Sequence, residues 1–246
     1  MNNNRIKILL LILSVFFISN TAYSQKFRLG PIIGLTAPTG DYSGTTMEYY
    51  AGTRYGMNSG VNFGALFKAG MGPFNLRVSA TYAPLSNTGQ AEPGEGFIDV
   101  KSDLLSFSIG PEFELTSIPT SIKPYLGADL LISSISGRTT FTDADFIPDG
   151  TYDMQSATRI GLGLGGGFEY GLGTGVLDIG IRYNLINLFG KKFEDVNPTA
   201  TRRLDSYLSL NDDPDPLAGS PTSVHPISTS RSISVIQVNV SYLFGF

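Results

Sequence analysis

Apolar and polar residues alternate with a period of two along most of the chain after residue 25. In the last segment, 236–246, aliphatic or aromatic side chains occupy every second position, and Gln237, Asn239 and Ser241 lie between them. Such alternation is typical of a β-strand with one apolar and one polar face. It recurs in eight segments, which are, in chain order, 27–36, 61–71, 74–82, 105–115, 124–133, 159–170, 177–185 and 236–246. The sequence therefore predicts an all-β protein.

The apolar faces of these eight segments contain no Asp, Glu, Lys, Arg or His. A surface in water does not need such strict exclusion, whereas a Lys or Arg at the middle of a bilayer costs about 2–4 kcal/mol. The connections alternate between short and long, and the long ones span 38–58, 86–98, 139–156 and 190–231. Short turns, long outer loops and an even strand number indicate an eight-stranded antiparallel up-and-down transmembrane β-barrel.

A secreted soluble β-sandwich is the alternative architecture, because it also joins many short strands. A sandwich would bury the apolar faces, and it gives no reason for the aromatic ending Tyr242-x-Phe244-x-Phe246. Pro31 and Pro111 fit a barrel wall poorly, since each removes a donor from the strand ladder. Each of them follows a glycine, so we expect β-bulges at both positions.

The first 24 residues have the pattern of a secretory signal peptide. Cations at positions 5 and 7 precede an apolar run over 8–18, and small residues stand at positions 22 and 24. The run is shorter than the ~20 residues that a spanning helix requires, which disfavours a retained helical anchor. Cleavage after Ser24 would leave a single barrel domain, 25–246.

Composition narrows the classes of function. Charged residues make up 15% of the chain, which is low for a soluble surface, and cysteine is absent. Disulfides and thiol chemistry are therefore excluded. The whole chain has a formal charge of −4, and residues 1–24 carry two cations and no acid, so the mature charge is −4 − 2 = −6. This sign argues against nucleic acid as a partner.

Charged residues on the polar faces are expected to line a narrow lumen, since eight strands enclose an interior that side chains nearly fill. A two-residue turn at 173–174 would place Glu169 opposite Asp178, and this like-charged pair needs a cation nearby. We expect Lys68 and Arg77 to reach these two acids from the other side of the barrel. The complete expected ion-pair network consists of Arg28, Lys68, Arg77, Glu112, Glu114, Asp129, Glu169, Asp178 and Arg182. Such a network predicts a plugged lumen, and a gated or ion-selective path is the alternative.

No catalytic, cofactor or metal site is assigned from the sequence. The single histidine, His225, lies in the longest expected loop and not in a strand, which disfavours a triad on the barrel wall. Gly161–Gly166 matches G-x-G-x-x-G but continues into more strand, so the dinucleotide context is missing. The acidic stretches 143–153 and 212–215 offer oxygen ligands for Ca²⁺, but their spacing does not match a calcium loop.

The eight segments resemble the small outer-membrane β-barrel family typified by the OmpA transmembrane domain, OmpX and OmpW. The stretch Gly34-Leu-Thr-Ala-Pro-Thr-Gly-Asp41 and the ending Tyr242-x-Phe244-x-Phe246 share in this resemblance. The junction Tyr-Ser-Gln at 23–25 is similar to Bacteroidota-type members. The resemblance implies a monomer in the outer membrane of a Gram-negative bacterium, in contact with outer-membrane lipid. It also implies that Tyr242, Phe244 and Phe246 form the signal that the barrel-assembly machinery reads.

Three functions stay open at this point. The first is a non-enzymatic barrel whose long extracellular loops contact host, phage or envelope partners. The second is a narrow porin or transporter for small or apolar solutes, as the likeness to OmpW implies. The third is a lipid-modifying enzyme, which the lack of a histidine in the strands disfavours. In the first long loop, Tyr42, Tyr49, Tyr50 and Tyr55 suit contact with a protein or glycan, and they could equally pack on the barrel rim.

Overall fold

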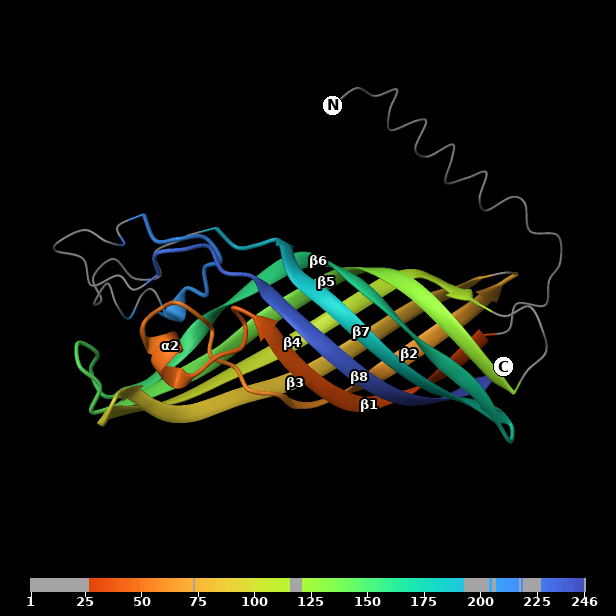
Figure 1. Ribbon diagram of the computed structural model, residues 1–246, viewed down its shortest axis with the longest axis horizontal. Helices are drawn as coiled ribbons and strands as arrows, with labels where there is room; N and C mark the ends of the chain where they lie inside the picture. The colour runs from red at the N-terminus through yellow and green to blue at the C-terminus, as the bar shows by residue number, and fades with distance from the viewer. Residues whose placement is uncertain are drawn as a thin grey trace, which may run out of the picture.

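The computed structural model describes residues 27–72, 74–115, 121–192, 204, 207–216, 218 and 227–245. Its strands form one closed antiparallel barrel in which neighbours in sequence pair and the last strand pairs with the first (Figure 1). The elements are β1 (Phe27–Gly40), α2 (Thr46–Tyr50), β2 (Gly60–Met71), β3 (Phe74–Glu92), β4 (Glu95–Glu114), β5 (Ile122–Thr142), β6 (Gly150–Leu172), β7 (Gly175–Phe189) and β8 (Ile233–Gly245). The prediction of an all-β, eight-stranded barrel is confirmed. Among the described residues, no helix has both the length and the apolar character needed to span a membrane.

The middle of the barrel carries apolar side chains on its outer surface and charged ones inside. Ile33 and Leu164 expose 68% and 64% of their surface, whereas Lys68 and Glu112 in the interior expose none. A soluble protein has the opposite distribution. This apolar band, with the closed ladder, contradicts the soluble sandwich, in which the apolar faces would be buried.

Beyond the apolar band, toward the end that carries the long connections, the distribution reverses. We call this end the outer end. Along β4, Leu104 is buried inside the barrel, while Asp103 and Lys101 lie on the outer surface. Apolar residues that point inward from β3 to β6 form one cluster with Tyr207 and with the tyrosines of the β1–β2 connection. This part of the barrel therefore has the apolar interior and polar exterior of a protein in water.

Strands β3 to β6 are longer than the sequence analysis predicted. The predicted long connections 86–98 and 139–156 are wrong, since most of these residues belong to paired strands. β3 and β4 turn at 93–94, where Gly94 has a φ of +85°, a conformation that suits glycine. At the edge of the band, the apolar residues change from outward-facing to inward-facing positions. The alternation of apolar and polar residues along the sequence therefore shifts by one position. The pattern used to find strands ends there, although the hydrogen-bonded ladder continues.

Pro31 and Pro111 do not form the expected bulges. The registers of β1 with β2 and of β3 with β4 run through them without a shift. In the ladder of β1 with β8, residues 30–31 have no partner, and in the ladder of β4 with β5 the same is true of residues 110–111. In both ladders the pairing then resumes in the same register. The expectation was wrong because a missing N–H removes a pair without inserting a residue. The register shifts lie in two other ladders, between β5 and β6 at Ile135/Gly137 and between β6 and β7 at Ile160/Leu162.

We predict that an added cation lowers stability only where a strand faces hydrocarbon. Ile109 points outward at the middle of the band on β4, so Ile109→Lys should lower the free energy of unfolding by about 2–4 kcal/mol. Thr88→Lys, on the exposed outer surface of β3 beyond the band, should change it by less than about 0.5 kcal/mol. Urea unfolding in lipid vesicles measures both values, and an equal loss for the two variants would contradict the membrane orientation.

Candidate functional site: the charged lumen and the outer mouth

Lys68 lies at the centre of a buried ionic cluster in the lumen. It projects inward from β2, and its Nζ donates hydrogen bonds to Glu112 Oε1 at 2.6 Å, Glu169 Oε1 at 2.9 Å and Asp178 Oδ2 at 2.5 Å. The carboxylates come from β4, β6 and β7, so one ammonium group links opposite sides of the barrel. Nζ also lies 4.1 Å from the centre of the Tyr125 ring, whose hydroxyl donates to Asp178 Oδ1 at 3.0 Å.

Two arginines supply the additional positive charge that three carboxylates require. Glu169 and Asp178 stand directly opposite each other on β6 and β7, and Lys68 bridges them. Arg28 of β1 forms an ion pair with Glu169, and Arg182 Nη2 lies 3.6 Å from Glu112 Oε2. Because a buried charge without a partner costs several kcal/mol, these contacts offset the cost of burying the three carboxylates.

Asp129 forms a second ionic cluster, next to the first one. Arg182 Nη1 donates to Asp129 Oδ2, and Arg77 Nη1 lies 3.4 Å from the same oxygen. Arg77 Nη1 also donates to the hydroxyl of Ser108 at 3.1 Å, and Ser79 and Ser108 share a hydrogen bond of 2.7 Å. The two clusters meet at Arg182, which contacts carboxylates in both.

Arg77 was expected to reach Glu169 and Asp178, and it contacts Asp129 instead. Lys68 and Arg77 are opposite each other on β2 and β3, so they compete for the same acids. Lys68 occupies Glu169 and Asp178, and Arg77 turns to the nearest remaining carboxylate. The expectation failed because strand order gives the side of the barrel but does not rank two neighbouring cations.

Glu114 lies apart from both ionic clusters, at the end of the barrel that carries the short turns. Its ion-pair partner is Lys123, with Nζ 3.5 Å from Oε2, and both side chains are partly exposed. Asn75 Nδ2 lies 3.4 Å from Glu114 Oε1, and Asn75 also accepts from Arg28 at 3.4 Å. Glu114 therefore contributes to the entrance of the lumen and not to its centre.

Two small cavities flank Arg77 and Arg182 within the lumen. Each has a volume of about 10 Å³, which is room for about one water molecule. Asn184 Oδ1, Asn239 Oδ1 and Ser241 Oγ belong to residues that line these cavities, and none of these atoms has a hydrogen-bond partner among the described residues. The cavities suit single buried waters and are too small for a solute.

The connection between β1 and β2 folds into the outer mouth of the barrel. Its tyrosines are almost fully buried, and they pack against the apolar interior of β3 to β6. Tyr42 and Ser102 share a hydrogen bond of 2.9 Å between hydroxyls, and Tyr49 and Thr139 share one of 2.8 Å. Of the two roles considered for Tyr42, Tyr49, Tyr50 and Tyr55, the structure shows packing.

Residues 207–215 of the longest connection enter the same mouth, beside α2 (Figure 1). Arg159 of β6 holds Asp212 with two hydrogen bonds of 2.9 Å, from Nε to Oδ2 and from Nη2 to Oδ1. The hydroxyl of Tyr55 donates to Asp212 Oδ1 at 2.6 Å, and the guanidinium of Arg231 lies 3.9 Å from the centre of the Tyr55 ring. These contacts join the barrel wall to two connections and close the mouth.

The pairing of Asp212 with Arg159 was not predicted from the sequence, where Asp212 was only part of an acidic stretch that offers oxygen ligands for Ca²⁺. In the described part of the chain, no group of three or more His, Asp or Glu residues is arranged to hold a metal. A signal was present in Arg159, which points into the lumen opposite Ser133, where an uncharged neighbour cannot balance it. Periodicity could show the need for an acid but not which loop provides it.

The expected assembly signal lies only partly within the described residues. Tyr242 and Phe244 are on the outer surface of β8, with their ring centres 4.9 Å apart and nearly perpendicular. The Tyr242 hydroxyl donates to the carbonyl of Leu172 at 2.9 Å, which ties β8 to the end of β6. Phe246, His225 and the expected signal peptide over 1–24 lie outside the described residues. Recognition by the assembly machinery and cleavage after Ser24 stay predictions.

Comparison with known proteins agrees with this architecture. The family described as "Outer membrane protein beta-barrel domain" matches residues 8–202. Neisserial surface protein A (NspA) has a similar structure, with 16% identity, 90% of this chain and 97% of that chain covered, and a TM-score of 0.48. The second similar structure is Ail, the attachment invasion locus protein of Yersinia pestis, in complex with the heparin analogue sucrose octasulfate. It has 12% sequence identity, 90% of this chain and 100% of that chain covered, and a TM-score of 0.40. No curated protein matches the sequence.

The chain belongs to the outer-membrane β-barrel family, because the family match extends over more than half of its length. This membership implies a location in the outer membrane of a Gram-negative bacterium. At these identities and TM-scores, the likeness to NspA and Ail supports no further conclusion about this chain.

We predict that removing the ammonium group of Lys68 strongly destabilises the barrel. Lys68→Met leaves three buried carboxylates without their shared partner, and should lower the free energy of unfolding by about 3–5 kcal/mol. Lys123→Met is the matched control, because it breaks a partly exposed ion pair and should cost less than about 1 kcal/mol. Urea unfolding of both variants in vesicles gives the comparison. A loss for Lys68→Met as small as that of the control would show that the cluster does not support the fold.

We predict that the outer mouth loosens in strong alkali. Burial raises the pKa of Tyr42 and of Tyr49 to about 12, from 10.0. The unfolded chain therefore loses these protons first, so the stability they contribute is complete below pH 10 and is lost as the pH rises through about 12. Tyrosinate absorbance should show a component near pH 12 that becomes smaller in a Tyr42→Phe, Tyr49→Phe variant. A titration that ends at the ordinary tyrosine pKa would refute this burial.

Proposed function

We propose that this protein is a non-enzymatic outer-membrane barrel that is closed to solutes and makes contacts at the cell surface through its outer end. The observation that carries this proposal is the double obstruction of the lumen. The cluster around Lys68 crosses the barrel between β2 and β7, and residues 207–215 with the buried tyrosines occupy the mouth. A solute would have to displace both.

The lumen chemistry supports a structural role over a catalytic one. The buried cations and carboxylates of the described lumen hold each other in ion pairs, and Lys68 is shared among three acids. Nucleophilic catalysis needs a base beside a nucleophile at a place that substrate can reach. Here the titratable groups are enclosed, and their mutual contacts stabilise the wall.

The outer end supports a role at the cell surface. Strands β3 to β6 continue beyond the apolar band with polar residues outward, and they carry their connections away from the lipid. The tyrosines that could have served as exposed contacts are buried, so a partner would bind the outer sheet surface and the tips of the connections instead.

We predict that the purified mature protein forms no steady channel in planar bilayers, because charged side chains fill the narrow lumen. Asp212→Asn weakens the contact with Arg159 and should also remain closed, since the cluster around Lys68 is untouched. A general porin in the same bilayers serves as the control for detection. Steady large openings from the wild-type protein would refute the closed barrel and favour the narrow porin or transporter.

The surface role is tested with the same wild-type protein and a variant in which residues 193–203 and 219–226 are each replaced by a short linker, so that residues 207–215 keep their contacts in the mouth. Cells that express each protein are exposed to labelled envelope and host-surface extracts. Retention that depends on the longest connection supports the proposal. Equal retention by cells without either protein contradicts it.

A further inference from the structure

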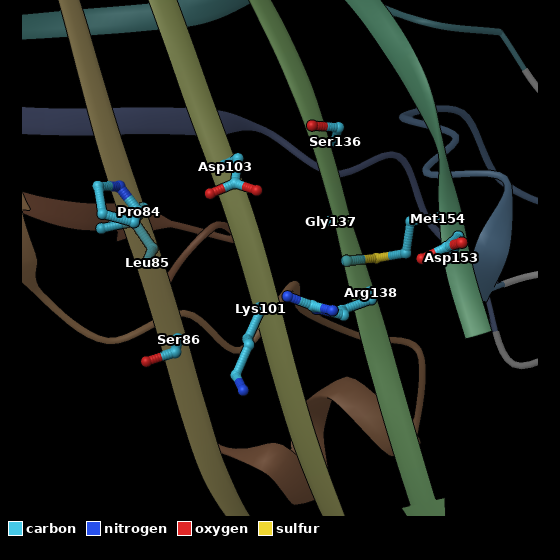
Figure 2. A pocket seen from close by; sticks show the side chains of 10 residues that line it. All are labelled: Pro84, Leu85, Ser86, Lys101, Asp103, Ser136, Gly137, Arg138, Asp153 and Met154. Carbon is cyan, nitrogen blue, oxygen red and sulfur yellow. The ribbon is translucent and has the colours of Figure 1, made fainter. Parts of the chain in front are cut away.

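Two cations lie directly opposite each other on the outer surface, just beyond the apolar band. Lys101 of β4 and Arg138 of β5 form a register pair, and both are exposed. A cavity of about 500 Å³ lies beside them, and Asp103, Ser86 and Ser136 also line it. In Figure 2 the guanidinium group of Arg138 extends toward the strand that carries Lys101. The cavity is next to the register shift between Ile135 and Gly137, where the ladder between β5 and β6 is locally disrupted.

This cationic pair is only partly balanced within the protein. Like charges directly opposite each other in a ladder are unfavourable. Lys101 Nζ lies 3.0 Å from Asp99, whereas Asp103 accepts a hydrogen bond of 2.5 Å from Tyr82. Asp153 is opposite Arg138 in the ladder, yet within the described residues the guanidinium group of Arg138 has no ion pair or hydrogen bond. The pair therefore keeps donors available for an anion.

The pair lies slightly above the layer of lipid headgroups, close enough for its side chains to reach back to it. Leu105 is the last outward apolar residue of the band on β4, and Lys101 is four residues farther along the strand. Four residues span about 13 Å, and a strand tilt of about 40° reduces this to about 10 Å above the hydrocarbon. The headgroup layer extends about 5–8 Å beyond the hydrocarbon, and the long side chains of Lys and Arg can reach back toward it.

We propose that Lys101 and Arg138 bind a phosphate group of an outer-leaflet lipid, with the adjoining headgroup seated in the cavity. A phosphate between the two cations replaces their repulsion with charge-assisted hydrogen bonds. The hydroxyls of Ser86 and Ser136 provide further donors on the cavity wall. Inorganic phosphate has the same chemistry, but the position of the pair beside the apolar band favours a group that is anchored in the membrane.

The test is native mass spectrometry of the full mature protein released from nanodiscs. The probes are phosphorylated lipid A, lipid A without its phosphates, and inorganic phosphate. The test variant is Lys101→Gln with Arg138→Gln. The matched control is Arg54→Gln with Lys123→Gln, which removes the same charge at exposed positions away from the cavity. Heat-dependent gel mobility verifies that each variant is folded.

The wild-type protein and the control should retain phosphorylated lipid A equally. The test variant should bind it at least about tenfold more weakly, because two charge-assisted contacts are lost. Equal retention by the test variant, or an equal loss in the control, overturns the site. Equal binding of the lipid without phosphates overturns phosphate recognition. Binding of inorganic phosphate as tight as that of the lipid assigns the site to a soluble anion and overturns the lipid as its ligand.

Discussion

The structure depends on one constraint, which is that backbone donors and acceptors surrounded by hydrocarbon must be paired within the protein. Pairing of β8 with β1 satisfies it by leaving the barrel without an edge. Once the ladder is closed, successive side chains alternate between lipid and lumen. The lipid admits only apolar groups, so charge accumulates inside. In a barrel of eight strands this charge has little water, and Lys68 and the arginines therefore pair with the inward carboxylates.

The ladder continues beyond the membrane, but the side chains exchange their places. On β4, Phe113, Ile109, Phe107 and Leu105 point outward within the band, whereas nearer the outer end Leu104, Val100 and Ile98 point inward. The tyrosines of the first connection and residues 207–215 fill the space that this exchange creates. The same strands thus form a membrane-spanning barrel and, directly above it, a part with the apolar core and polar exterior of a soluble protein. The closed lumen and the ordered mouth are two results of one continuous sheet.

The sequence allowed good prediction where a single physical rule applies and poor prediction where two rules compete. Hydrocarbon forces alternation, so strand number, order and outward faces could be predicted. One turn length fixes Glu169 opposite Asp178. The choice between Lys68 and Arg77 depends on distances of a few ångströms across the lumen, which periodicity does not contain. The place of Asp212 depends on the path of a long connection, and its charge alone suggested only an oxygen ligand for Ca²⁺.

The height of the barrel wall is unequal around its circumference. Strands β3 to β6 have 19, 20, 21 and 23 residues, whereas β1, β2, β7 and β8 have 14, 12, 15 and 13. On the tall flank, a mutation that inserts a residue disturbs a ladder, while on the low flank it lengthens a connection. Divergence between related chains is therefore least constrained on the low flank. Antibodies or phages that select for change at this surface would drive most of it there, and the tall flank would keep its shape across lineages.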